Sequence, residues 1–161
     1  MLYRVKQFFK AMTAKITANE KNFIEFYLNE DERRLFYSLP EYEQAHCLRV
    51  AKDVLSNCRT NEEKQCVLVK AALLHDIGKL AGGLNIITKS IMVLLDKSMP
   101  GFVSRFKKFK MVDTYYNHPE KAFLYIKDQG DYFGYLIRNH HNYSMNGDEG
   151  LKLLQDADSR N

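Results

Sequence analysis

Five histidines and one aspartate are the residues of this chain with the clearest chemical potential. The histidines are His46, His75, His118, His140 and His141. His75 and Asp76 directly follow a nearly continuous apolar run over residues 67–74, so both side chains are expected to be carried into the interior. A buried carboxylate is costly unless it is paired or bound to a metal, and imidazole with carboxylate suits Mn, Fe, Co, Ni or Zn. The pair therefore indicates either a metal site or, equally, a buried His–Asp hydrogen-bonded pair.

Helices must position these residues, because the sequence has few helix breakers and no convincing strand pattern. Only three prolines and eight glycines occur in 161 residues, of which 45% are apolar and 27% charged. We therefore predict an all-α fold, a single compact helical bundle with enough residues to bury a core.

Apolar spacing and start and stop signals place the predicted helices. They cover residues 2–16, 23–28 as part of a second helix, 38–57, 61–76, 88–110 in one or two pieces, 118–130, 131–140 and 148–158. Residues 38–41 and 60–63 resemble capping boxes that begin with Ser38 and Thr60. His118-Pro119 puts proline in a first helical turn, which predicts that His118 lies near an N-cap. Gly78 and residues 82–83 are expected to end the buried helix.

Five short motifs, in order along the chain, resemble those of HD-domain phosphohydrolases. They are His46-Cys47-Leu48-Arg49-Val50-Ala51, His75-Asp76-Ile77-Gly78-Lys79, His118-Pro119-Glu120-Lys121-Ala122, Arg138-Asn139-His140-His141 and Gln155-Asp156-Ala157-Asp158. The resemblance implies an all-α HD domain in which ligands from different helices meet at one metal centre. We expect residues 1–161 to form a single HD domain: a helical extension over 1–37 and an HD core over 38–161. A helical insertion near 85–112 could form a lid.

The resemblance also implies a ligand set. HD proteins with two histidines beyond the first histidine, the HD pair and the last aspartate usually hold two metals, so a binuclear site is favoured. Asp76 would bridge the ions. The other ligands would be His46, His75 and Asp158 on one side and His118 and His140 on the other, with His141 as a possible additional ligand. The ions would be divalent: Fe, Mn, Ni, Co, Mg or Zn.

Two aspartates compete for the role of terminal ligand. Residues two apart on a helix point about 200° away from each other, so only one of Asp156 and Asp158 can face the site. Asp158 continues the apolar stripe of Leu151 and Leu154, whereas Asp156 turns away from it. We therefore predict that Asp158 binds metal and that Asp156 is exposed.

Three cations are candidates for substrate binding: Arg49, Lys79 and Arg138. Lys79 follows Asp76 by three residues, where it could bind a phosphate and add positive charge at the transition state. We expect Asp76 and Lys79 to be the catalytic residues. A salt bridge or simple exposure is the alternative for both arginines, and it is slightly favoured for Arg138. The basic and aromatic run over 105–110 is expected to be a solvated amphipathic helix rather than a membrane-binding surface.

The implied activity is metal-dependent hydrolysis of a phosphate ester or anhydride, with a nucleotide or dinucleotide as the natural substrate class. Two metals would lower the pKa of a bridging water toward ~7. The Gly-Tyr-Pro motif of HD proteins that hydrolyse cyclic di-GMP is absent, since the chain continues as Asn142-Tyr143-Ser144, and this argues against that substrate. Two alternatives stay open: an HD-type mixed-valent di-iron oxygenase and a non-catalytic metal- or nucleotide-binding module.

Composition argues against several other classes. A net charge of +4 is too small to predict specific nucleic-acid binding. No apolar stretch reaches the length of about 18 residues that a transmembrane helix needs, and the N-terminal residues, whose apolar positions are interspersed with charge, are not expected to form a signal peptide. The cysteines are an odd set without CxxC spacing, which predicts reduced thiols: Cys47, Cys58 and Cys66. We expect a cytoplasmic protein whose partner is a small phosphorylated substrate.

Overall fold

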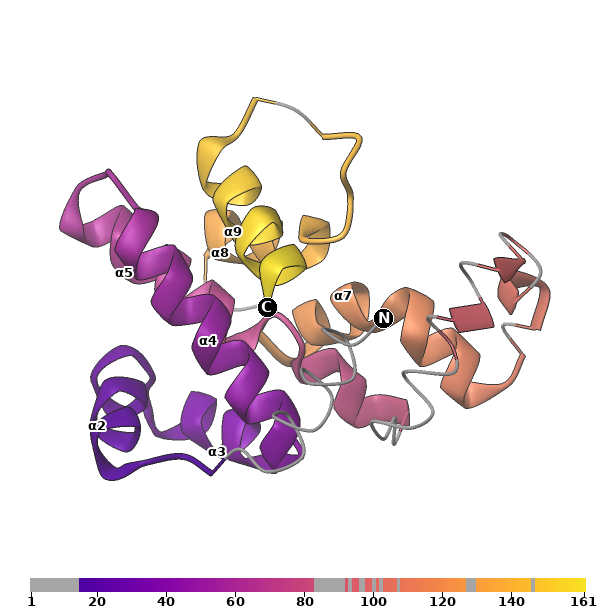
Figure 1. Cartoon of the computed structure of the whole chain (residues 1–161), viewed down its shortest axis with the longest axis horizontal. Coiled ribbons are helices and arrows are strands. Elements are labelled where there is room, and N and C mark those ends of the chain that lie inside the picture. The colour runs from indigo at the N-terminus through magenta and orange to yellow at the C-terminus, as the bar shows by residue number, and fades with distance from the viewer. Residues whose placement is uncertain are drawn as a thin grey trace.

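The computed structural model describes residues 15–82, 92, 94–95, 98–99, 101, 103–106, 108–126, 130–145 and 147–161. These residues form helices and no strand, which confirms the predicted all-α fold (Figure 1). The helices are α2 (Ala18–Tyr27), α3 (Glu30–Ser38), α4 (Glu41–Asn57), α5 (Glu62–Leu74), α7 (Lys110–Ile126), α8 (Asp131–Asn139) and α9 (Glu149–Arg160), with the 3-10 helices η1 (Ile77–Gly82) and η2 (Val103–Phe106). Of the helix predicted over 2–16 only residues 15 and 16 are described, and they are not helical; ten of the 23 residues predicted as helix over 88–110 also lie outside the described residues.

Helix α5 lies at the centre of the bundle, as its apolar sequence predicts. It packs against α4, α8 and α9 and also contacts α2 and α3. Lys70, the one charged interruption of its apolar run, forms an ion pair of 2.8 Å with Glu32 of α3, whose carboxylate is fully buried. Because a buried carboxylate needs a partner, Lys70 compensates the charge of Glu32 and links α5 to α3.

The starts of α4 and α5 differ from the predicted capping boxes. Asn61 rather than Thr60 caps α5, since its side chain accepts a hydrogen bond from the Lys64 N–H. Helix α4 begins after Pro40 without a side-chain cap. The predicted cap, Ser38, belongs to α3 instead, where its hydroxyl donates to a backbone carbonyl of that helix.

Helix α3 was not predicted. Its sequence is dominated by charge, so apolar spacing does not reveal it. The signal that could have found it is the capping box between Asn29 and Glu32, in which each side chain accepts a hydrogen bond from the other residue's backbone N–H.

Helix α7 runs continuously through Pro119, so His118 lies in the middle of a helix and not near an N-cap. The prediction from His118-Pro119 was therefore wrong. The first half of α7 carries the buried residues Val112 and Thr114, whose burial stabilises helix upstream of the proline.

Gly78 allows η1 to lie directly against α7. A Cβ atom at this position would come within 1.9 Å of the His118 carbonyl oxygen and 2.6 Å of the Ala122 backbone nitrogen. Helix α5 already ends at Leu74, so Gly78 and Gly82 lie within η1 and do not end the buried helix as expected. The close approach brings Asp76, two residues before Gly78, beside the turn of α7 that carries His118.

We expect the substitution Gly78→Ala to lower the free energy of unfolding by about 1–3 kcal/mol, the usual cost of overpacking. The added methyl group would meet backbone atoms of α7, which cannot move aside as the end of a flexible side chain can. Urea unfolding of the metal-free protein measures the change. An unchanged free energy of unfolding would show that η1 and α7 are not in backbone contact.

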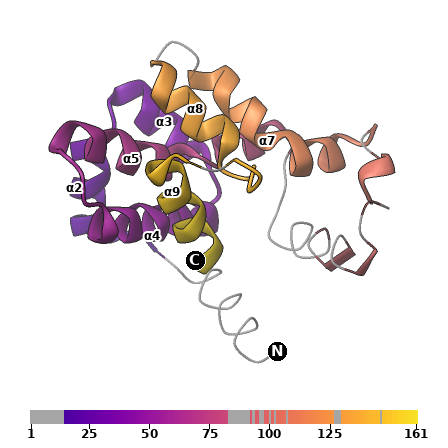
Figure 2. The ribbon, with the colours of Figure 1, turned by 90° about the horizontal axis from the view of Figure 1, so that it is seen from above.

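The segment around η2 lies to one side of the bundle (Figures 1 and 2). Its buried residues Met92, Val103 and Val112 form a small apolar cluster separate from the main core. The basic and aromatic run over 105–110 forms the end of η2, a turn and the first residue of α7 where it is described, and not the single helix expected.

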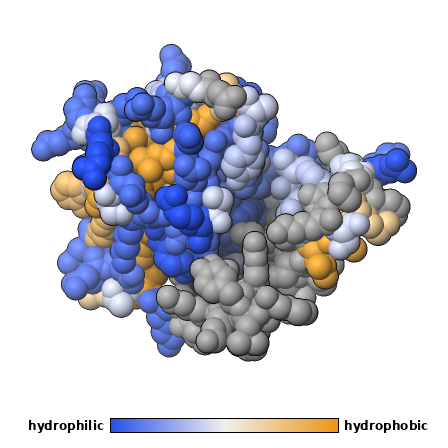
Figure 3. Space-filling view, turned by 45° about the horizontal axis from the view of Figure 1, so that its top comes forward, coloured by the Kyte–Doolittle hydropathy of each residue, from blue (hydrophilic) through white to orange (hydrophobic). Residues whose placement is uncertain are grey.

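The face in Figure 3 is mainly hydrophilic where it is described. None of the described helices is long and apolar enough to cross a membrane.

Candidate metal centre

Five helices bring the seven predicted ligands to one place. His46 comes from α4, His75 from the C-terminal cap of α5, Asp76 from the link to η1, His118 from α7, His140 from the C-terminal cap of α8, His141 from the next position and Asp158 from α9. His46 and Asp158 are 112 positions apart in the sequence, yet their side chains are in hydrogen-bond contact. The helical bundle therefore assembles the cluster from residues that are distant along the chain.

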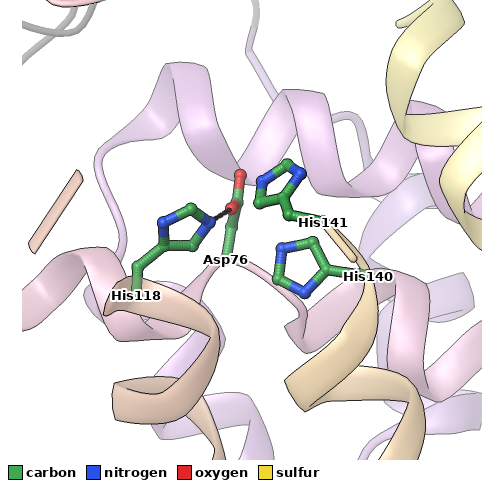
Figure 4. Close-up of side chains that lie close together, drawn as sticks. All are labelled: Asp76, His118, His140 and His141. Atoms are coloured by element: carbon green, nitrogen blue, oxygen red, sulfur yellow. Dashed lines mark ion pairs between the residues drawn. The ribbon is translucent and has the colours of Figure 1, made fainter. Parts of the chain in front are cut away.

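Two groups of ligand atoms share Asp76. One group is His46, His75 and Asp76, the other is Asp76, His118, His140 and His141, and within each group the atoms lie within 4.8 Å of one another. Asp76 Oδ2 lies 3.7 Å from His46 Nε2 and 3.4 Å from His75 Nε2. Asp76 Oδ1 lies 3.3 Å from His118 Nε2. The two carboxylate oxygens thus face different groups, and Figure 4 shows the second group around the carboxylate.

Asp158 lies against the first group. Its Oδ1 atom is 2.9 Å from His46 Nε2 and 3.5 Å from His75 Nε2. Burial raises the pKa of Asp158, but its contacts with His46 and His75 together outweigh burial and hold the pKa well below its usual range. Asp156 is exposed, as expected from the apolar stripe of this helix.

The three most buried histidines are oriented by the same backbone contact. In each ring Nδ1 meets the carbonyl oxygen three residues earlier: His75 with Ala72 at 2.9 Å, His118 with Tyr115 at 2.9 Å and His140 with Ile137 at 2.7 Å. A carbonyl can only accept, so in the neutral ring Nδ1 carries the proton and Nε2 carries the lone pair.

Those three Nε2 atoms indicate what the centre can hold. They are buried and, within the described part of the chain, make no hydrogen bond. Leaving a buried polar atom without a partner is costly, and native proteins avoid it. A divalent metal is the partner that a lone pair on neutral imidazole suits best, and a carboxylate beside it completes a familiar ligand set. The residues present therefore fit a metal ion.

The charge states of the rings differ. Burial, followed by the neighbouring imidazoles, lowers the pKa of His140 well below its usual value. Burial and His118 lower the pKa of His141 to about 4. Burial also lowers the pKa of His75, but the Asp76 carboxylate together with Cys47 and Asp158 outweighs burial, and the pKa lies well above the usual value. Metal binding would therefore release a proton from His75, whereas His140 and His141 are already neutral.

Lys79 lies inside the centre and is not directed toward solvent. Its ammonium contacts the Asp76 carboxylate and lies 3.2 Å from Oε2 of Glu43. Lys79 and Glu43 are both buried, so their opposite charges compensate each other. Glu43 was not predicted. It precedes His46 by three residues on α4 and so shares its helix face, and this spacing is the signal that could have found it.

The two arginine candidates differ in position. Arg49 is half-buried on α4, three residues after His46, and burial lowers its pKa. Arg138 is exposed and donates hydrogen bonds of 2.8 and 2.6 Å to Glu120, with its guanidinium 4.3 Å from the centre of the Phe123 ring. The salt-bridge alternative therefore describes Arg138, and the structure does not bring it into the centre. It precedes His140 by two residues, which turns it to the other side of the helix.

Comparison with known proteins identifies the family. A family model of the HD domain matches residues 44–160, a stretch that includes every predicted metal ligand. No curated protein and no solved structure matches the chain significantly. HD domains form a superfamily of metal-dependent phosphohydrolases that bind divalent ions, and the His and Asp groups described above could hold such an ion. The match covers well over half of the chain and carries all five motifs in order, so this protein belongs to the HD-domain family.

Proposed function

We propose that this protein is a phosphohydrolase with a binuclear metal centre, which cleaves a phosphate ester or anhydride such as that of a nucleotide or dinucleotide. The carboxylate of Asp76 carries the proposal, because its two oxygens face two separate groups of imidazole nitrogens. One ion would be held by His46, His75, Asp76 and Asp158, and the other by Asp76, His118 and His140, with His141 adjacent. Both ions would be divalent, from the set Fe, Mn, Ni, Co, Mg and Zn.

The chain's own cations would bind and orient the substrate. Bound metal ions would supply a nucleophilic water at neutral pH and neutralise the phosphoryl oxygens. Lys79 contacts the Asp76 carboxylate, and its ammonium could donate to a phosphoryl oxygen bound there and stabilise charge that develops on it. Glu43 would hold that ammonium in place. Arg49, one turn along α4 from His46, is suited to bind phosphate through two parallel N–H donors.

We further propose that residues 38–161 form the HD core, with 1–37 as an extension and 85–112 as an insertion that serves as a lid. The separate apolar cluster of Met92, Val103 and Val112 supports the insertion, as does the position of η2 beside the bundle. In the order of the chain the insertion would lie between η1 and the part of α7 that carries His118.

A substrate screen tests the proposed reaction. Protein purified without chelators would be analysed for metals and assayed with phosphomonoesters, phosphodiesters and nucleoside polyphosphates in the presence of Mn or Fe. We expect metal-dependent phosphate release that is lost in His75→Ala and kept in the exposed control Asp156→Asn. Equal release by wild type and His75→Ala would contradict the proposal. Iron with oxygen uptake and no phosphate release would identify the oxygenase instead.

A further inference from the structure

We infer that Pro119 is a positioning residue of the metal centre. Because proline has no N–H, the Tyr115 carbonyl is left to accept from Nδ1 of His118, and this fixes the proton on Nδ1 and the lone pair on Nε2, the nitrogen that faces Asp76. The inference rests on the proposed function only in taking His118 as a metal ligand. The tautomer of the ring can be measured without any metal.

His118 stands in a different backbone setting from the other two buried histidines. His75 and His140 are the C-terminal caps of α5 and α8. The last carbonyls of a helix have no N–H partner within the helix, so each of these rings meets a carbonyl that is available to it. His118 lies inside α7, well before its end at Ile126. There each carbonyl normally accepts from the N–H four residues later.

Pro119 removes the backbone N–H that would otherwise compete with the His118 ring for the Tyr115 carbonyl. In a regular helix the Tyr115 carbonyl would accept from the N–H of residue 119, but proline has no N–H and its ring crowds that carbonyl. Nδ1 of His118 lies 2.9 Å from the Tyr115 carbonyl oxygen instead. The imidazole thus takes the place of the missing backbone donor, and α7 continues through the proline.

The hydrogen bond at Nδ1 decides whether Nε2 of His118 carries a proton or a lone pair. This atom is buried and lies 3.3 Å from Oδ1 of Asp76. If Nδ1 did not donate to Tyr115, the ring could carry its proton on Nε2 and donate it to the Asp76 carboxylate. That tautomer would satisfy both groups without metal and would block the lone pair that a metal needs. Pro119 therefore favours the tautomer whose Nε2 lone pair can bind metal over the tautomer whose Nε2 proton would bond to Asp76 in place of the metal.

The test uses two substitutions that restore an N–H at position 119. Both substitutions improve helix propensity, Pro119→Gly less than Pro119→Ala, so comparing the two separates the effect of the N–H from that of helix stability. Long-range 1H–15N NMR of the metal-free protein reports the His118 tautomer. We expect the wild type to carry the proton on Nδ1 and both variants to shift toward Nε2. Pro40→Ala, a proline substitution at the start of α4, is the matched control and should leave the tautomer unchanged.

Titration calorimetry with Mn gives the second readout. We expect both variants to bind the ion of the His118 group about 10-fold or more weakly, the usual effect of removing a partner that orients a ligand. Pro119→Ala should at the same time raise the melting temperature of the metal-free protein. If Pro119 had only a structural role, a variant with a more stable fold would not bind the metal more weakly. An unchanged tautomer would overturn the inference and leave the proposed function standing. A shifted tautomer with no second metal in the wild type would support the tautomer role and contradict the binuclear centre.

Discussion

Replacing Asp76 with alanine is expected to empty both halves of the centre and to reduce hydrolysis by at least about 1,000-fold. Asp76 is the one residue that belongs to both groups of ligand atoms, with Oδ2 facing His46 and His75 and Oδ1 facing His118. Its removal would also leave the Lys79 ammonium with one carboxylate partner fewer at the centre. Elemental analysis of metal per chain and initial rates with Mn measure the two effects.

His75→Ala provides the comparison for this experiment. His75 belongs to one group only, so this variant should lose the ion of the His46 group, and the ion of the His118 group should be less affected. Circular dichroism of both variants would confirm that they keep the helical fold. If Asp76→Ala retained the metal content of the wild type, Asp76 would not be a bridging ligand.

The second large effect is expected from Asp158→Asn, which should weaken metal binding and reduce activity by about 100-fold or more. Asp158 Oδ1 lies 2.9 Å from His46 Nε2, and the carboxylate is ionised because its contacts with His46 and His75 together outweigh burial and hold its pKa well below the usual range. An amide keeps the shape but loses the negative charge that a divalent ion requires.

Asp156→Asn is the matched control, since it makes the same chemical change two residues away on the same helix. Asp156 is exposed, so this variant should have wild-type metal content and activity. Metal affinity by calorimetry and rates on the same substrate compare the pair. If Asp156→Asn were the damaging substitution, the assignment of the terminal ligand would be reversed. If neither substitution changed metal binding or activity, α9 would supply no ligand.

Residues close together in the sequence made part of this centre predictable. The apolar run before His75 placed the HD pair in the interior, and the stripe formed by Leu151 and Leu154 separated Asp158 from Asp156. These predictions depend on local helix geometry alone. The structure agrees with them because α5 and α9 each bury the face that their sequence makes apolar.

The remaining features depend on contacts between distant segments. Lys79 is held by Glu43, 36 positions away, and no local pattern shows that pairing. Arg138 donates a hydrogen bond to Glu120, which lies on another helix 18 positions away in the sequence. His118-Pro119 looks locally like a helix start. Whether α7 extends upstream of the proline is decided by burial of its first half, which local sequence does not show.

The most direct test of the central claim is an anomalous-scattering crystal structure of the protein loaded with Mn, with metal content measured on the same preparation. We predict two ions per chain, about 3.5–4 Å apart, with one on each oxygen of Asp76. Nε2 of His118 and Nε2 of His140 should bind the ion on the Oδ1 side, and Nε2 of His46 and Nε2 of His75 the other. A single fully occupied ion, with the His118 ring turned away from it, would contradict the binuclear centre.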